Sequence, residues 1–166
     1  MTRALIGLGS NLGDRERNLR TALAHLEATG AARVVAVSAF VETEPVVLPG
    51  HAGPLPPRYL TGAAVVETTL RPRALLAALK SAEAAAGRRP GVERWGPREA
   101  DLDLLLFGDE TVDETVDETA GEPGLVVPHP QMAERRFVLV PAAEVAPEMR
   151  HPRLGRTVRE LLEALP

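Results

Sequence analysis

The spacing of hydrophobic positions changes several times along the chain, and each change marks the border of a predicted element. Short apolar or β-branched runs bounded by turn-forming residues predict four strands, at residues 3–8, 33–43, 59–70 and 101–107. Leucines at helical spacing predict two helices between them, one capped by Asp14 and ending at Gly30, the other opened by Pro72 and ending near Gly87. The elements therefore follow the order β-α-β-β-α-β.

This order predicts an α+β fold, an α/β sandwich in which a ferredoxin-like antiparallel sheet carries both helices on one face. An acidic tandem, a short helix or turn at 130–136 and an apolar segment at 137–145 follow the fourth strand. A last helix is expected from Thr157, because Thr157 and Glu160 have the spacing of a capping box. At 166 residues and 45% hydrophobic content, the chain is expected to form a single domain over residues 1–166.

The segment between the second and third strands, residues 44–58, is expected to be a long loop. It holds five of the 15 prolines and two glycines, and that composition disfavours regular secondary structure. Long loops inside compact domains often serve as functional lids. This loop is therefore a candidate lid over a functional site.

Composition excludes several classes of function. The chain has no cysteine, so it has no disulfide, thiolate nucleophile or cysteine metal site, as is typical of a reducing cytoplasm. No apolar run reaches the roughly 18 residues that a membrane-spanning helix needs, and the apolar run at the amino terminus is too short for a secretory signal. We expect a soluble, cytoplasmic protein with no membrane partner.

The net charge of −4 originates in one short segment. Residues 109–120, DETVDETVDETA, carry six of the 23 acidic residues and leave 17 against 19 basic residues elsewhere. A four-residue period fits neither a strand nor a capped helix well, which favours an exposed, extended or mobile hairpin, with an extra cation site as the alternative. The strands also lack the aromatic pattern of RNA-binding sheets, so no nucleic-acid partner is expected.

Two aspartates, Asp101 and Asp103, interrupt the apolar fourth strand. Because side chains alternate between faces, one face should carry Asp101, Asp103, Leu105 and Phe107, and the other Leu102, Leu104 and Leu106. The two carboxylates would stand about 6.5–7 Å apart and would need a counter-charge on a half-buried surface. Either the strand is an edge with a solvated polar face, or the pair holds a divalent cation, for which oxygen ligands suggest Mg²⁺.

The loop before this strand favours the metal interpretation. It contains Arg88, Arg94 and Arg98, and planar guanidinium groups bind phosphate oxygens in pairs. Carboxylates for a metal beside arginines for phosphate are typical of phosphoryl transfer. The chain has no Walker sequence, and the glycines of GLGSNLG at 7–13 have the wrong spacing for a dinucleotide site, so a tight strand-to-helix turn is expected there.

Four segments carry a family resemblance: GLGSNLGD, YLTGAAVVETTL, GRRPGVERWGPREADLDLLLFG and VPHPQMAERRFVLVP. They resemble the 6-hydroxymethyl-7,8-dihydropterin pyrophosphokinase family of folate biosynthesis nearly end to end, and the string from Arg94 to Gly108 is the most specific. The resemblance implies a ferredoxin-like fold. It also implies Mg²⁺-dependent transfer of the terminal pyrophosphate of ATP to the hydroxymethyl group of the dihydropterin, with two Mg²⁺ ions and release of AMP.

The resemblance also assigns roles to residues around the phosphates. Asp101 and Asp103 look like the metal ligands. Arg88 and Arg98 match arginines of a mobile catalytic loop, which would stabilise charge on the phosphates as AMP leaves. The further ATP contacts implied by the match are Glu83, Arg98, His129 and Arg135.

A second group of residues matches the pterin site of the family. By resemblance, Tyr59 and Phe137 flank the ring and Trp95 closes the loop over it. Backbone near Thr43 and Val46 binds the polar edge of the ring. From the residues alone, Tyr59 could instead be a packing anchor and Phe137 a core residue, and both interpretations stay open.

Thr61 departs from the family pattern, because members often have an asparagine there that donates to the pterin. A hydroxyl cannot imitate an amide with its separate donor and acceptor, so the affinity for pterin is expected to differ. ATP and a dihydropterin are the partners implied, with a monomer as the expected state. A ferredoxin-like binding module without catalysis and another metal-dependent kinase with a different acceptor are the alternatives, and AMP as product would separate the three.

Overall fold

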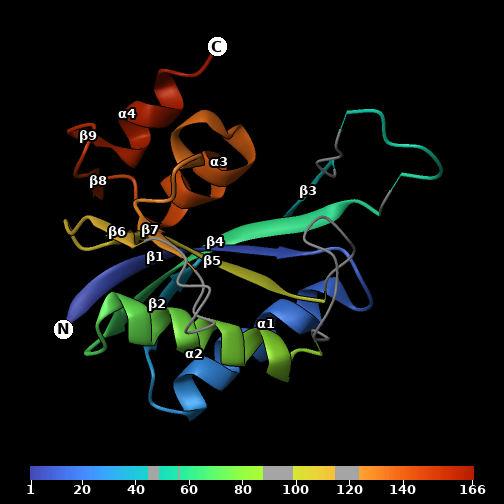
Figure 1. Cartoon of the computed structure of the whole chain (residues 1–166), viewed down its shortest axis with the longest axis horizontal. Coiled ribbons are helices and arrows are strands. Elements are labelled where there is room, and N and C mark those ends of the chain that lie inside the picture. The colour runs from blue at the N-terminus through green and yellow to red at the C-terminus, as the bar shows by residue number, and fades with distance from the viewer. Residues whose placement is uncertain (45–48, 56, 88–98, 115–123) are drawn as a thin grey trace.

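A five-stranded antiparallel sheet forms the centre of the computed structural model (Figure 1), which describes residues 1–44, 49–55, 57–87, 99–114 and 124–166. The strand order is β2-β4-β1-β5, and β3 pairs with β4 along the same edge as β2. The strands are β1 (Thr2–Ser10), β2 (Arg33–Val37), β3 (Val41–Thr43), β4 (Tyr59–Thr68) and β5 (Asp101–Phe107). The predicted ferredoxin-like α+β fold is confirmed.

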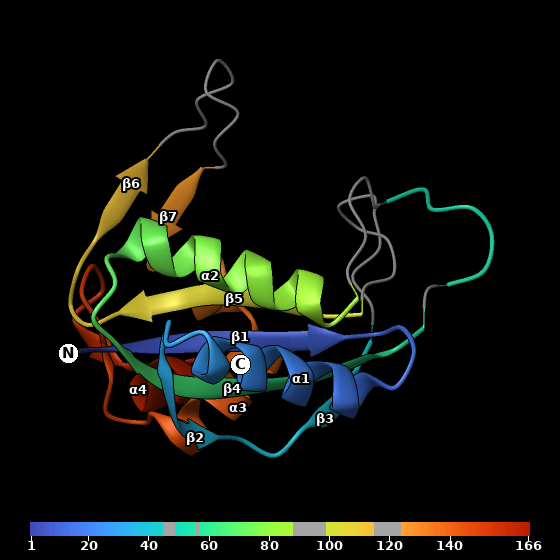
Figure 2. The same ribbon diagram turned by 90° about the horizontal axis from the view of Figure 1, so that it is seen from below.

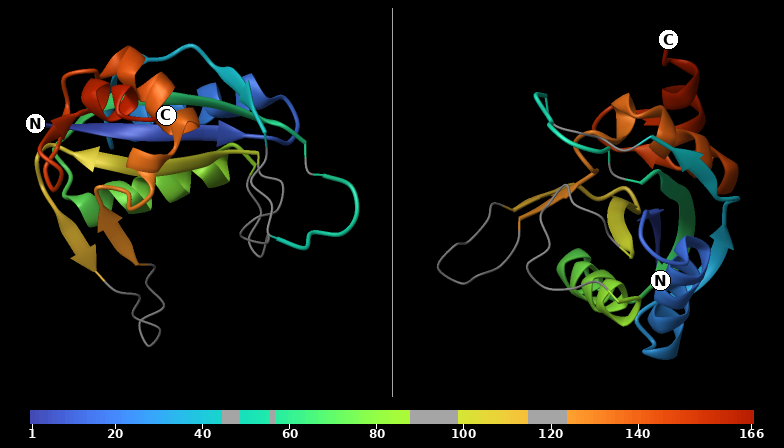
Figure 3. Two further views of the ribbon diagram at one scale, coloured as in Figure 1. Left: turned by 90° about the horizontal axis from the view of Figure 1, so that it is seen from above. Right: turned by 90° about the vertical axis from the view of Figure 1, so that its right-hand side faces the viewer.

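Helices cover both faces of the sheet (Figures 2 and 3). On one face lie α1 (Arg15–Ala28) and α2 (Pro72–Ala85), as predicted. The Asp14 side chain accepts a hydrogen bond from the Arg17 N–H at 3.2 Å and so caps α1, while Pro72 occupies the first turn of α2. The opposite face is covered by α3 (Arg136–Val145) and α4 (Val158–Glu163).

The sheet therefore has two hydrophobic cores. The core beneath α1 and α2 includes Ile6, Val66 and Leu79, and the core beneath α3 and α4 includes Val65 and Leu139. The consecutive residues Val65 and Val66 of β4 thus serve opposite cores. A strand buried on both faces reads as a continuous apolar run, which explains why the strands were visible in the sequence.

The predicted alternation of faces along β5 fails at its carboxyl end. Leu5 of β1 pairs with Leu106, but the next residue, Ile6, pairs with Leu104, so Leu105 is an extra residue in the ladder. A bulge of this kind shifts the following side chains to the other face. Leu106 consequently joins the core beneath α3, and Phe107 joins the core beneath α2, the reverse of the prediction.

The run predicted as one strand at 33–43 is two strands, β2 and β3, separated by residues 38–40. Ser38 is tied to Ala63 of β4 twice, through Ser38 N–H to Ala63 O and Ala63 N–H to Ser38 Oγ, both at 2.9 Å. The Ala39 N–H instead donates to the Glu144 carboxylate of α3 at 3.1 Å. These bonds replace a regular ladder at the break.

A separate two-stranded ribbon leaves the end of β5, formed by β6 (Val112–Glu114) and β7 (Leu125–Val127) (Figure 2). The described part of the acidic tandem is thus extended, as predicted. Two ion pairs, Arg71–Glu110 and Arg73–Glu114, join this acidic segment to the start of α2. Among the described residues, no group of three or more His, Cys, Asp or Glu side chains is placed to hold a metal ion.

The carboxyl-terminal region contains the remaining elements. The segment expected to be a helix or turn at 130–136 holds a short 3₁₀ helix, η1 (Met132–Glu134), and the first residue of α3. A small ribbon, β8 (Arg150–His151) with β9 (Arg156–Thr157), precedes α4, whose predicted capping box between Thr157 and Glu160 is confirmed. None of the described helices combines the length and apolar character that crossing a membrane requires.

We expect Leu79→Ala to lower the free energy of unfolding by about 2–5 kcal/mol, because the Leu79 side chain of α2 is fully buried in the core and the truncation leaves a cavity. Leu154→Ala is the control: Leu154 is 52% exposed, and surface changes usually stay within about 0.5 kcal/mol. Urea denaturation of both variants measures the difference. Equal losses in the two variants would contradict the assignment of Leu79 to the core.

Candidate active site

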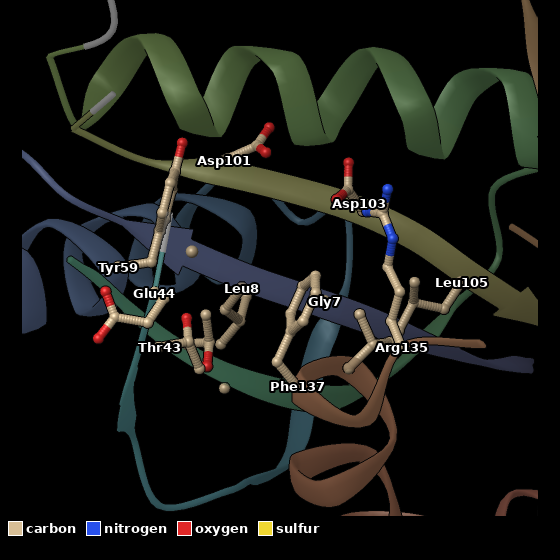
Figure 4. A pocket seen from close by; sticks show the side chains of 14 residues that line it. Gly7, Leu8, Thr43, Glu44, Tyr59, Asp101, Asp103, Leu105, Arg135 and Phe137 are labelled. Carbon is tan, nitrogen blue, oxygen red and sulfur yellow. The ribbon is translucent and has the colours of Figure 1, made fainter. Parts of the chain in front are cut away.

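A cavity opens on the face of the sheet that α3 covers, at the end where β1 finishes and β5 begins (Figure 4). Five elements and their flanking residues supply its walls: β1, β4 and β5 from the sheet, the end of β3, and the start of α3. Its lining includes Gly7, Gly9, Thr43, Glu44, Tyr59, Thr61, Asp101, Asp103, Leu105, Arg135, Phe137 and Val138. Predicted phosphate and pterin residues thus share one cavity.

Asp101 and Asp103 both line this cavity, so the prediction that they share a face of β5 is confirmed. Both are half-buried. In the ladder with β1, Asp101 stands opposite Gly9 and Asp103 opposite Gly7. Residues directly opposite in an antiparallel pair share a face, so the positions next to the carboxylates carry no side chain.

Gly7 and Gly9 therefore shape the floor of the cavity. A Cβ atom on Gly9 would lie 3.3 Å from Cδ1 of Tyr59, and one on Gly7 would lie 3.4 Å from Cδ1 of Leu105. The glycine-rich sequence at 7–13 predicted a strand-to-helix turn for these glycines, whereas β1 continues to Ser10. Their spacing of two residues, the period of one face of a strand, was the signal for this role.

The carboxylate pair fits a hard cation. Two carboxylates face an open space that Gly7 and Gly9 keep clear, and Mg²⁺ typically takes one or two carboxylates and completes its shell with water and substrate phosphate. Asp101 and Asp103 are thus the described residues that could hold Mg²⁺.

Arg135 brings positive charge to the same end of the cavity. Figure 4 shows its side chain reaching toward Asp103. Its guanidinium group donates to Oε1 of Gln131, and its Cζ lies 5.5 Å from the centre of the Phe137 ring, a cation–π distance. Arg135 thus links the carboxylate end of the cavity to its aromatic wall.

His129 is held close to β5 by its own backbone. Its N–H donates to the Leu105 carbonyl oxygen at 3.0 Å, and its Nδ1 accepts the Gln131 N–H at 3.2 Å. Burial, and then the positive charge of Arg135, lower the pKa of His129, while the negative charge of Asp101 opposes them. With Nδ1 as an acceptor, the neutral ring carries its proton on Nε2 and can donate it to an anion.

Glu83 does not line the cavity; it lies behind β5. Its side chain is only 1% exposed and pairs with Lys80 at 3.4 Å. Its Oε2 accepts the N–H of Leu102, the residue between the two aspartates, at 2.8 Å. The structure therefore gives Glu83 a contact with the backbone that carries the carboxylates, and a direct contact with ATP stays a prediction.

The residues assigned to the pterin come from the wall of the cavity that β3, β4 and α3 form. Thr43, Tyr59, Thr61 and Phe137 all line it. Thr61 is 7% exposed and its hydroxyl donates to the Val41 carbonyl oxygen at 3.3 Å, so what Thr61 still offers a ligand is chiefly an acceptor. Among the remaining predictions, Arg88, Arg98, Val46 and Trp95 lie outside the described residues.

Comparisons with known proteins agree with this geometry. A model of the 7,8-dihydro-6-hydroxymethylpterin-pyrophosphokinase (HPPK) family matches residues 5–147. The chain belongs to the HPPK family. It is 41% identical to the 2-amino-4-hydroxy-6-hydroxymethyldihydropteridine pyrophosphokinase of Pseudomonas aeruginosa, over 99% of this chain and 92% of the relative. The Bacillus subtilis protein of the same name is 42% identical over 88% of this chain and 79% of the relative.

Solved structures support the HPPK fold. A crystal structure of an HPPK-DHPS with substrates matches 98% of this chain with a TM-score of 0.76 at 14% identity. The wild-type HPPK-DHPS of Plasmodium falciparum also matches 98% of this chain, with a TM-score of 0.70 at 15% identity. The chain spans 43% and 44% of those longer proteins. These matches show the fold, and the family model with the named relatives makes the chain a pyrophosphokinase-family enzyme.

We expect this HPPK chain to lose stability as the pH falls from about 7.5 to about 5.5. The pKa of His129 is lowered from its ordinary 6.5, so the unfolded chain binds a proton at a higher pH than the folded chain, and protonation favours unfolding. The pKa of His151 is also lowered by burial, so His129→Gln should reduce this loss without abolishing it. Denaturant titrations at each pH compare the two proteins, and identical pH profiles would contradict the expectation.

Proposed function

We propose that this chain transfers the terminal pyrophosphate of ATP to the hydroxymethyl group of 6-hydroxymethyl-7,8-dihydropterin and releases AMP, in a Mg²⁺-dependent step of folate biosynthesis. The observation that carries the proposal is one cavity lined by two carboxylates from β5 and by two aromatic side chains, Tyr59 of β4 and Phe137 of α3. Asp101 and Asp103 suit metal and phosphate, and Tyr59 and Phe137 suit a flat heteroaromatic ring. Family membership and the names of the relatives support the same reaction.

In this proposal Asp101 and Asp103 would hold Mg²⁺, two ions in all, with ATP as the co-substrate. When bound, the metal supplies positive charge to the phosphate oxygens. The chain's own task is to keep the two carboxylates on one face and at a fixed spacing. Pairing of β5 with β1 fixes the spacing, and Glu83, bonded to the Leu102 N–H, holds the backbone between them.

The phosphates of ATP would lie between the carboxylates and the basic side chains. His129 can donate from Nε2, and Arg135 lines the cavity beside Asp103. Arg88 and Arg98 stay in the proposal by resemblance and would stabilise charge as AMP leaves. The hydroxymethyl oxygen forms a bond to the β-phosphorus. The bond between the β-phosphorus and the oxygen that it shares with the α-phosphate breaks, and that oxygen leaves with AMP. The hydroxyl proton is released to solvent.

The dihydropterin would lie against the aromatic wall of the cavity. Tyr59 and Phe137 offer the stacking faces, and Thr43 and Thr61 lie within the same wall. Val46 and Trp95 complete this part of the proposal by resemblance. We also propose that residues 1–166 act as one domain, as a monomer in the cytoplasm, with ATP and the dihydropterin as partners.

The reaction is tested by incubating the protein with ATP, Mg²⁺ and the dihydropterin and identifying the nucleotide released. We expect AMP and a pyrophosphorylated pterin in equal amounts. ADP would indicate an ordinary kinase with this metal site. Absence of turnover, with the pterin still bound, would indicate a binding module.

We expect Asp101→Asn and Asp103→Asn each to reduce kcat at least about a hundredfold, because an amide lacks the charge that holds the cation and a lost charge-stabilising group costs on that order. Steady-state AMP release against Mg²⁺ concentration measures the effect. Asp113→Asn is the matched control, since Asp113 is an exposed aspartate of β6 outside the cavity. A near wild-type rate in either cavity variant would refute the metal assignment.

Phe137→Leu is expected to raise the Kd for the dihydropterin by about threefold to tenfold, because a stacked aromatic pair contributes about 0.5–1.5 kcal/mol beyond its buried area. Isothermal titration calorimetry with the pterin gives the Kd. Phe107→Leu is the matched control: Phe107 is fully buried in the core on the opposite face, so this variant should lose stability and keep its pterin affinity. Equal Kd values for Phe137→Leu and the wild type would leave Phe137 as a core residue only.

A further inference from the structure

A very short strand contributes to the wall of the cavity that is proposed to bind the pterin. β3 has only three residues, Val41–Thr43, and pairs with the first three residues of β4. Thr43, its last residue, stands opposite Tyr59, and both line the cavity. Short strands with few ladder bonds are weakly held, so another interaction must keep Thr43 and Tyr59 in place.

Arg15, the first residue of α1, makes that interaction. Its NH1 donates to the Arg58 carbonyl oxygen at 3.0 Å, and its NH2 donates to Oε1 of Glu42 at 2.5 Å. Glu42 belongs to β3, and Arg58 directly precedes β4. One guanidinium group therefore joins both ends of the connection between β3 and β4, and its side chain is only 29% exposed.

The contact reaches β3 from behind the cavity. Glu42 stands opposite Leu60, which packs against the core beneath α1 and α2. Glu42 therefore points to the face that α1 and α2 cover, and Thr43 points to the opposite face, where the cavity lies. α1 begins at the end of the sheet where β3 lies (Figure 2). The hydrogen bond and the charge of Arg15 lower the pKa of Glu42, in keeping with a charged pair.

Neighbouring contacts reinforce the same junction. Nδ2 of Asn11 donates to the Pro57 carbonyl oxygen at 3.3 Å, next to the carbonyl that Arg15 holds. Nε of Arg58 lies 3.1 Å from Oε1 of Glu44, which lines the cavity, and NH1 of Arg58 lies 4.0 Å from Glu42. The charges therefore alternate across the junction: Arg58 joins its own arm to β3 through Glu42 and Glu44, and Arg15 contacts both arms from α1.

We propose that Arg15 is a positioning residue for the dihydropterin. From the face that α1 and α2 cover, it bridges β3 and the start of β4 and so fixes Thr43 and Tyr59 in the cavity wall. This inference rests on the proposed function. It goes beyond it by assigning substrate affinity to a side chain on the opposite face of the sheet. Arg15 does not contact Asp101, Asp103 or His129, the described residues proposed for metal and phosphate. Binding of ATP should therefore be unaffected when the Arg15 side chain is replaced.

The first test measures order in β3 without any ligand. Hydrogen exchange is followed by mass spectrometry in the full chain for wild type, Arg15→Met and Arg15→Lys. We expect Arg15→Met to speed exchange in Val41–Thr43 by about tenfold, as expected for loss of a charge-assisted bond, and to leave the centre of β1 unchanged. Arg15→Lys keeps the charge but not the fork that reaches two acceptors, so it should give an intermediate rate.

The second test measures substrate binding. Calorimetry with 6-hydroxymethylpterin, in the presence of Mg²⁺ and a non-hydrolysable ATP analogue, gives the pterin Kd; the analogue is titrated separately. For Arg15→Met we expect about a tenfold weaker pterin Kd and an unchanged Kd for the analogue. Arg17→Met is the matched control, because Arg17 is an exposed arginine in the same turn of α1, and the bond it donates to the Asp14 cap comes from its backbone N–H, which the substitution keeps.

The outcomes separate the two proposals. Unchanged exchange in β3 of Arg15→Met overturns the positioning role, and so does faster exchange with an unchanged pterin Kd. Equal weakening of pterin and ATP-analogue binding also overturns it, because the effect would then be general destabilisation. If the wild type binds the analogue but no pterin, the proposed function fails, and the exchange data alone show whether Arg15 orders β3.

Discussion

The register between β1 and β5 is the constraint on which the site depends. It places Asp101 opposite Gly9 and Asp103 opposite Gly7, so two like charges stand beside two positions without side chains. Half-buried carboxylates repel each other unless a counter-charge enters, and the glycines leave the space for one. A shift of one residue would turn both aspartates into the core beneath α1 and α2, so the fold cannot change this register without losing the site.

Much of the arrangement followed from the sequence because both faces of the sheet are covered. Two-sided burial made the central residues of β1, β4 and β5 apolar, and Asp101 and Asp103 stood out against that background. Strand periodicity alone placed them on one face, and helical spacing with the Asp14 cap placed α1 and both of its ends. The roles of Tyr59 and Phe137 came from family resemblance, and their common cavity came only from the structure.

The features that the sequence did not predict depend on contacts between distant segments. The bulge at Leu105 is a property of the pairing between two strands, and no local pattern in β5 encodes it. The break between β2 and β3 depends on bonds from Ser38 to Ala63 and from Ala39 to Glu144, partners up to a hundred residues away. Gly9 looked like a turn residue because glycine favours turns. Its spacing of two residues from Gly7 fits one face of a strand, but its pairing with Asp101 is seen only in the structure.

Polar side chains behind the cavity hold the strands whose residues line it. Glu83 accepts the backbone N–H between the two aspartates at one edge of the sheet, and Arg15 holds Glu42 beside Thr43 at the other. Edge strands have donors and acceptors that no neighbouring strand uses, so β5 and β3 are the strands that most need such support. Functional side chains on short or edge strands are precise only when the opposite face is anchored. In this fold α1 and α2, which cover the back of the sheet, supply these anchors as Arg15 and Glu83. Under the proposed function, this face of the sheet would also contribute to substrate recognition.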